Sequence, residues 1–328
     1  MEVEIYTDET YFENWRYIGI ICLFVPTKYK EKFVNELTNL RCPNRNWFWN
    51  YETCNNENKC SKQNHIMNNS EIHFNELNNA SHNKKVICKN WLDFLMEYNQ
   101  NKGSEDDDLI YFKILYLDLD KIDKSQFGVT SDKNNIYNRF YRSIVIGVRK
   151  FFFTDRFFRI REFFHDQASD KENHDLFPWY TPTRLSNSRD FDILNEEIIF
   201  IDSNHKTHKN IEYKKNSQLI QFSDLILGSV TEAIFHKATN KNKIYFSNYI
   251  FDLVKRLWYN PKNPNSHYNY YRKMDVSIFP RDKIMVQEDL FKELKQVEGQ
   301  FHRRLSIRER RDYNNESGPL DKYFSFKK

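Results

Sequence analysis

Four acidic residues occupy positions from which carboxylates could act together, although they lie far apart in the chain. They are Asp8, Glu71, Asp166 and Asp224. Asp8 ends an alternating apolar and polar run, where metal-dependent enzymes often keep a ligand; a turn-forming aspartate is the alternative. Oxygen ligands of this kind favour hard cations such as Mg²⁺ or Mn²⁺ over zinc. The four residues therefore form the candidate catalytic and metal site.

Asp224 belongs to a polar stripe on an otherwise apolar helix, which the periodicity predicts over residues 217–237. The stripe consists of Gln221, Asp224, Gly228 and Thr231. A buried carboxylate costs free energy unless a cation or hydrogen-bond donors meet it, which favours a functional role over simple exposure to solvent. Gly228, in a chain with only 7 glycines, indicates that another part of the backbone approaches this face of the helix.

Other polar residues compete with these four or could assist them. Asp118 and Asp120 end an apolar strand predicted over residues 109–119, and they are rival ligands or an ordinary acidic strand exit. His73 and His165 are close in sequence to two of the acids. They could transfer protons, and satisfied structural histidines are the alternative.

Residues 41–70 form an insertion that is poor in aliphatic side chains. It contains four soft ligands, Cys42, Cys54, Cys60 and His65, which could hold a structural Zn²⁺ in place of a hydrophobic core. The insertion lacks the close Cys-x-x-Cys spacing of common zinc knuckles. Reduced cysteines with a surface histidine are therefore the alternative.

Composition removes several classes of protein. With 7 glycines in 328 residues, the chain cannot build a glycine-rich phosphate-binding loop. No apolar run approaches the roughly 18 residues of a membrane span, so we expect a cytoplasmic protein with no membrane partner.

The 50 basic and 46 acidic residues give a net charge of +4, and an arginine cluster follows residue 302 (Arg303, Arg304, Arg308, Arg310 and Arg311). Such a cluster suits nucleic acid phosphates, or a solvated helix end.

Hydrophobic periodicity predicts an α/β protein with a mixed sheet and helices on both of its faces. The predicted strands cover residues 3–10, 17–26, 71–74, 109–119, 157–166, 197–203 and 276–280. The predicted helices cover residues 28–40, 81–98, 135–153 and 217–237, with two more beyond residue 240. We expect one domain over residues 1–240, interrupted by the insertion at 41–70, and a helical extension over residues 241–328.

Three motifs resemble the domain of unknown function 3800 family. The opening Tyr6-Thr7-Asp8-Glu9-Thr10 is similar to its Asp-Glu-Ser start, and Gln221 to Gly228 is similar to its late helix motif, Gln-x-Ala-Asp-x-x-x-Gly. Glu71-Ile72-His73 resembles its middle acidic motif, in which a lysine usually stands two residues after the glutamate. Thr10, Ser223 and His73 depart from the pattern, and no carboxylate is lost. The match spans about residues 3–238.

The resemblance implies a ribonuclease H-like fold and metal-dependent hydrolysis of phosphodiester bonds in DNA or RNA. Two Mg²⁺ or Mn²⁺ ions would activate a water and stabilise the leaving oxygen. Asp8 would bridge the two ions, Asp166 and Asp224 would each bind one, and Glu71 would bind the second ion or the water. A recognition or scaffold subunit without catalysis is the alternative function, and a nucleotide-handling phosphohydrolase is a third.

Overall fold

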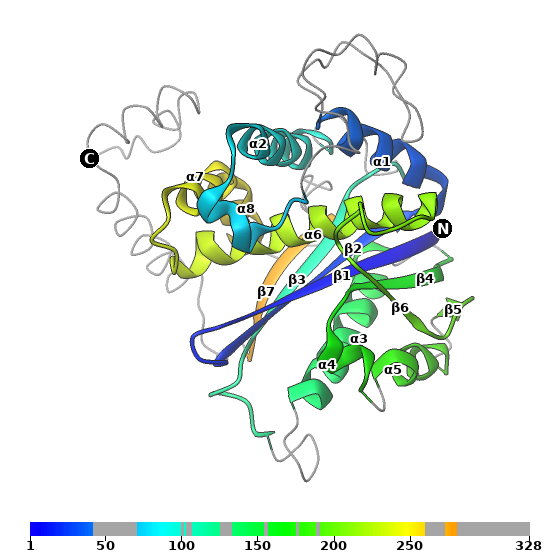
Figure 1. Ribbon diagram of the computed structural model, residues 1–328. Helices are drawn as coiled ribbons and strands as arrows, with labels where there is room; N and C mark the ends of the chain where they lie inside the picture. Colours follow the sequence, from blue (N-terminus) through cyan, green and yellow to red (C-terminus); the bar gives the residue numbers. More distant parts are fainter. Residues whose placement is uncertain are drawn as a thin grey trace.

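A mixed seven-stranded sheet forms the centre of the molecule in the computed structural model (Figure 1). The structure describes residues 1–41, 71–99, 102, 107–124, 133–153, 157–174, 177–187, 191–259 and 273–280. The strands are β1 (Glu2–Phe12), β2 (Tyr17–Pro26), β3 (Tyr111–Asp118), β4 (Arg159–Asp166), β5 (Asp192–Ile193), β6 (Ile198–Ile201) and β7 (Met274–Phe279). Their order is β5-β4-β1-β2-β3-β7, and β6 also pairs with β4. The predicted α/β class is confirmed.

β1 is the strand that brings the two halves of the sheet together. It pairs antiparallel with β2 and parallel with β4. Residues Val3 to Asp8 are buried because both faces of β1 are covered, and Asp8 is the last buried residue before a partly exposed end. The strand continues beyond Asp8 to Phe12, so Asp8 lies within a strand and is not a turn residue.

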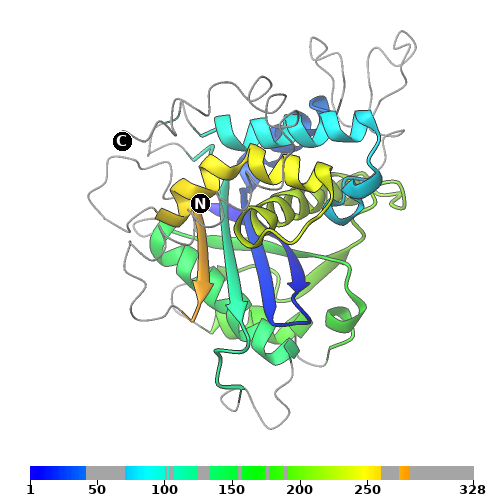
Figure 2. The same cartoon turned by 90° about the vertical axis from the view of Figure 1, so that its left-hand side faces the viewer.

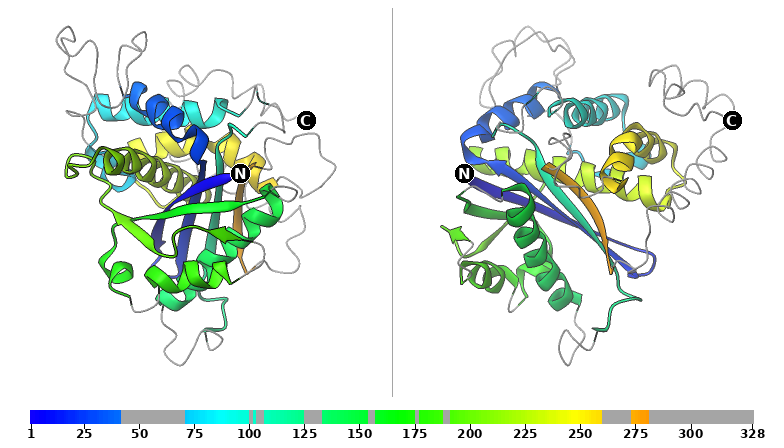
Figure 3. Two further views of the ribbon diagram at one scale, coloured as in Figure 1. Left: turned by 90° about the vertical axis from the view of Figure 1, so that its right-hand side faces the viewer. Right: turned by 180° about the vertical axis from the view of Figure 1, so that it is seen from behind.

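Helices cover both faces of the sheet, as the sequence predicted (Figures 2 and 3). One face carries α1 (Lys30–Asn39), α2 (His82–Glu97), α6 (Ile211–Phe235), α7 (Lys241–Tyr249) and α8 (Phe251–Tyr259). The other face carries α3 (Lys133–Phe152), α4 (Ser169–Glu172) and α5 (Phe177–Ser186). Each face has its own buried cluster of aliphatic and aromatic side chains. Burial of each such side chain contributes about 1.5–3 kcal/mol, so the two clusters fix the layers.

The segment at residues 71–73 differs from the prediction. It is extended but pairs with no strand among the described residues, and a short 3-10 helix, η3 (Phe74–Asn79), follows it. The backbone N–H groups of Ile72 and Phe74 donate to side chains of α6 instead of to a strand. An alternation of apolar and polar residues predicts an extended backbone. It does not show whether the backbone N–H groups will bind another strand or side chains of a helix.

The part of the chain after residue 240 shares this core as far as the structure describes it. α7 and α8 pack on α6, and β7 pairs parallel with β3. The predicted boundary after residue 240 therefore falls between two helices that contact each other. Among the described residues, no helix is both long and apolar enough to cross a bilayer.

Two predictions fall on parts of the chain outside the described residues. One is the zinc site of Cys42, Cys54, Cys60 and His65, and the other is the arginine cluster from Arg303 to Arg311. Both stay predictions.

Candidate active site

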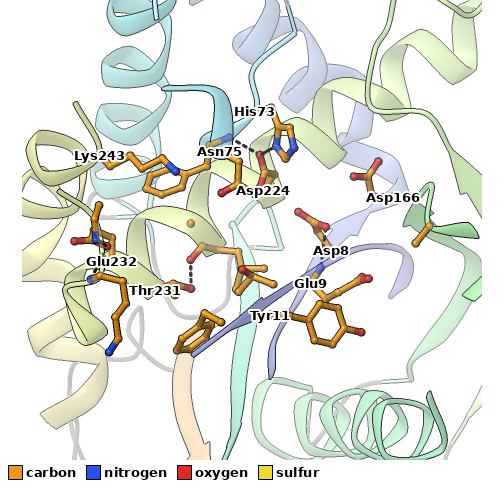
Figure 4. A pocket seen from close by; sticks show the side chains of 18 of the residues that line it. Asp8, Glu9, Tyr11, His73, Asn75, Asp166, Asp224, Thr231, Glu232 and Lys243 are labelled. Carbon is orange, nitrogen blue, oxygen red and sulfur yellow. Dashed lines mark hydrogen bonds and ion pairs between the residues drawn. The ribbon is translucent and has the colours of Figure 1, made fainter. Parts of the chain in front are cut away.

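A pocket of about 420 Å³ collects three of the four predicted carboxylates. Asp8, Asp166 and Asp224 line it together with His73 (Figure 4). The parallel register of β1 and β4 explains the first two: Thr7 pairs with His165, so Asp8 and Asp166 follow at the same end of neighbouring strands. Asp224 comes from α6, which lies across this face of the sheet. Residues more than 150 positions apart thus meet in one place.

Burial and neighbouring negative charges raise the pKa of two of these carboxylates, Asp8 and Asp166. Burial raises the pKa of Asp8 well above its ordinary value, and the charges of Asp224, Asp166 and Glu9 raise it further. For Asp166, burial and the charge of Asp224 raise the pKa to about 7. This repulsion disfavours three charged carboxylates in the absence of a cation.

His73 is the positive group nearest to this cluster. Its Nδ1 donates to the Asp224 carboxylate at 2.6 Å, and this hydrogen bond raises the pKa of His73 to about 9. The backbone N–H of Phe74 donates to the same oxygen of Asp224 at 2.7 Å. His73 is therefore charged at neutral pH and balances part of the negative charge of the pocket.

The polar stripe on α6 holds the 71–74 segment in place. Gln221 accepts the N–H of Ile72 at 2.9 Å and donates to the carbonyl of Ser203 at 2.5 Å. One turn beyond Asp224, Gly228 leaves room for the side chain of Phe74, whose ring atoms an added Cβ would meet at 2.2 and 2.3 Å. The close approach predicted at Gly228 is present, but a side chain makes it and not a backbone. Gln221 is thus buried, and the half-buried Asp224, Gly228 and Thr231 line the pocket.

Glu71 lies at the margin of the site and does not line the pocket. Its carboxylate accepts a hydrogen bond from the hydroxyl of Ser203, in the loop after β6. Its charge still reaches His73, where it contributes to the raised pKa. The structure therefore brings three of the four predicted acids together in the pocket, and Glu71 lies outside its lining.

His165 points away from the pocket into the core beside α3. Its Nδ1 donates to the carbonyl of Asp166 at 2.7 Å, and its Nε2 accepts from the hydroxyl of Tyr137 at 2.7 Å. Burial lowers the pKa of His165. The structural role that we considered for this histidine accounts for its contacts.

A buried ion pair beneath the pocket was not predicted. Lys171 of α4, only 1% exposed, binds the carboxylate of Glu9, whose other oxygen lies 3.2 Å from His165 Nε2. The opposite charge of Glu9 raises the pKa of Lys171, although burial opposes this. Glu9 follows Asp8 in β1, and Lys171 lies in α4, the helix that follows β4, so this ion pair ties the end of β1 to the segment after β4. The adjacency of Glu9 to Asp8 was the only signal for it in the sequence.

The rival carboxylates lie elsewhere. Asp118 binds the guanidinium of Arg16 through two bonds of 3.2 Å, and Asp120 lies 3.3 Å from the same group. Neither residue lines the pocket. Arg16 lies at the β1–β2 turn, so this group is a structural ion pair at the hairpin.

The three carboxylates are ligands of the kind that a hard cation prefers, but they do not lie close enough together to enclose one. Asp8, Asp166 and Asp224 supply only carboxylate oxygens, which Mg²⁺ and Mn²⁺ prefer. Across the described ranges, however, no three side chains of His, Cys, Asp or Glu are grouped closely enough to hold an ion. Binding would require these carboxylates to move together.

Comparison with known proteins does not assign the chain to a family. No protein-family model matches it, and no curated protein matches it either.

Proposed function

We propose that the protein is a metal-dependent nuclease that hydrolyses phosphodiester bonds in DNA or RNA. The observation that supports this most strongly is the meeting of Asp8, Asp166 and Asp224 in one pocket, from two strand ends and a helix. Such a concentration of negative charge is costly unless cations offset it. The motif resemblance to the domain of unknown function 3800 family agrees with this proposal, because two of its motifs carry Asp8 and Asp224.

In the proposed reaction, Asp8 is central because it lies between Asp166 and Asp224. When bound, Mg²⁺ or Mn²⁺ supplies an activated water and stabilises the leaving oxygen. Asp8, Asp166 and Asp224 would hold the metal, and Glu71 would enter only by leaving Ser203. His73 holds Asp224 in the metal-free protein and would be displaced from it as the charge of the cation replaces that of the imidazolium. The Lys171–Glu9 pair ties the end of β1 to α4, the helix that follows β4.

The decisive experiment compares Asp8→Asn with Asp120→Asn in cleavage of single- and double-stranded DNA and RNA with Mg²⁺ or Mn²⁺. Asp120 is an exposed acid outside the pocket, so its variant loses the same charge without touching the site. We expect Asp8→Asn to reduce cleavage more than about a hundredfold, since even residues that only orient metal ligands are worth 10–100-fold. Asp120→Asn should retain activity, and a chelator should abolish it in wild type.

The opposite result would identify the alternative function. If wild type binds nucleic acid but cuts none of these substrates with either metal, and Asp8→Asn changes neither property, the protein is a recognition or scaffold subunit.

A further inference from the structure

The pocket has a basic end as well as an acidic one. Figure 4 shows Asp8 and Asp166 on one side of the pocket and Lys243 on the other, with Asp224 between them. Lys237 also lines this second end, but it is ion-paired with Glu13 of the β1–β2 turn. No described carboxylate lies within ion-pairing distance of Lys243. Its ammonium group is therefore the charge at this end that is available for a ligand.

The surrounding elements fix the position of Lys243. It stands in the first turn of α7, where the Asn240 side chain accepts the N–H of Asn242 at 2.9 Å. The Asn242 amide in turn donates to the carbonyl of Leu77 in η3 at 2.8 Å. The Lys243 ammonium lies 5.4 Å from the centre of the Phe74 ring, and Phe74 is also next to Asp224. Lys243 is thus connected to the acidic cluster through η3 and α6.

The acid nearest to Lys243 is already satisfied by other groups. Glu232 is buried, and its Oε2 accepts the backbone N–H groups of Lys237 and Ala238 at 3.0 and 2.7 Å. It binds these two backbone N–H groups just after the end of α6 and does not form an ion pair with Lys243. Burial lowers the pKa of Lys243, while the charges of Glu232 and Asp224 act in the opposite direction. A lysine that is partly buried without a direct partner gains most from an anionic ligand.

We infer that Lys243 binds a backbone phosphate of a nucleic acid strand, next to the phosphate that is cut at the carboxylates. This inference rests on the proposed function and adds a subsite to it. A pocket of about 420 Å³ is of the size that holds a small ligand, so it suits a short segment of one strand better than a duplex. Tyr11 and Phe12 also line the pocket, and aromatic rings beside a positive charge are typical of single-strand binding.

The test measures binding of a fluorescent single-stranded octanucleotide, with Ca²⁺ in place of Mg²⁺, at several salt concentrations. Lys243→Met keeps the apolar stem on Phe74 but removes the charge, so we expect affinity to fall about tenfold. The salt dependence should also become shallower by about 0.7 in log–log slope, the value for one lost phosphate contact on a single strand. Lys243→Arg should restore most of the affinity, and thermal unfolding should show that both variants fold.

Lys241→Met is the matched control, because Lys241 lies on the same helix but is exposed and outside the pocket. Lys241→Met should change the affinity for the oligonucleotide by less than about twofold. A second arm replaces one phosphate at a time with an uncharged methylphosphonate. In wild type one position should cost about tenfold, and in Lys243→Met the same position should cost nothing, because the two changes remove one contact.

The outcomes separate this inference from the nuclease proposal. Equal effects of Lys243→Met and Lys241→Met, or full additivity with every methylphosphonate, would overturn the subsite even if the protein cleaves. Binding that depends on Lys243 without cleavage in any metal would retain phosphate binding and overturn the nuclease. A wild type that binds no oligonucleotide would overturn both.

Discussion

Asp8 and Asp166 are unusual because the groups that donate to their carboxylates are backbone N–H groups and not cations. Asp8 accepts the N–H of Glu9 at 2.8 Å, and Asp166 accepts the N–H of Gln167 at 3.0 Å. These bonds lower the pKa of each acid, but burial and mutual repulsion outweigh them. A site built for structure alone would pair such acids with lysine or arginine, as the hairpin does with Asp118. The charge balance of the pocket is therefore the property to measure.

The first prediction concerns pH. The pKa of Asp166 is raised to about 7 and that of His73 to about 9, so in both cases the folded state holds its proton more tightly than the unfolded state. The free energy of unfolding of the metal-free protein should therefore fall as pH rises from about 6 to 9, by at most about 1.4 kcal/mol per pH unit for each group. Urea denaturation in chelator measures this.

Asp166→Asn is the control for that prediction, because it removes the group that titrates near pH 7. The variant should lose less stability between pH 6 and 8 than wild type does. Mg²⁺ should stabilise wild type more at pH 8 than at pH 6, where protons compete for the same oxygens. A stability that is constant or rises over this range in wild type would contradict the assigned charges.

The second prediction concerns the buried pair beneath the pocket. Lys171→Met leaves the Glu9 carboxylate buried without its cation, so the free energy of unfolding should fall by about 3–5 kcal/mol. Adding Glu9→Gln should recover a large part of this loss, since it removes the unpaired charge. Lys89→Met, in a half-exposed pair with Asp93 on α2, should cost less than about 1 kcal/mol. Equal losses for Lys171→Met and Lys89→Met in urea denaturation would show that the pair is unimportant.

At the scale of elements, α6 organises the site through residues spaced at three, four and three positions. Gln221 and Asp224 bind the backbone of the 71–74 segment, Gly228 receives Phe74, and the Thr231 hydroxyl lies 2.9 Å from that of Tyr116 in β3. Asp224 therefore has a structural role in addition to the proposed metal ligation. Its position follows from helix periodicity, because these spacings place side chains on one face.

Gly228→Ala tests whether that contact positions the site. A Cβ would overlap the Phe74 ring, so the segment that carries His73 must move, and we expect a loss of about 1–3 kcal/mol in unfolding free energy. The affinity for Mn²⁺ should fall as well. Gly147→Ala on α3 is the matched control, because its Cβ would meet nothing closer than 4.0 Å and should stabilise the helix by up to about 1 kcal/mol. Equal stability of the two variants would refute the packing argument.

At the scale of the whole molecule, the sequence predicted β1 to β4, β6 and β7, the helices α1, α2, α3 and α6, and three of the converging acids, but not β5, α4 or α5. Asp8 and Asp166 could be placed because they lie near the ends of apolar strands, and parallel strands bring such ends together. The pairing of Ile72 and Phe74 with α6 could not be predicted, since it depends on side chains about 150 residues away. Lys171 and Lys243 were missed for the same reason: each is an ordinary lysine until the fold brings it to the pocket.

The most direct test of the account is a crystal of the full chain soaked in Mn²⁺ and measured for anomalous scattering. We expect a peak between the carboxylates of Asp8, Asp166 and Asp224, with Nδ1 of His73 no longer bonded to Asp224. The same soak of Asp8→Asn crystals should show no peak there. An ordered wild-type pocket without anomalous density, in which His73 still binds Asp224, would contradict the proposed metal site.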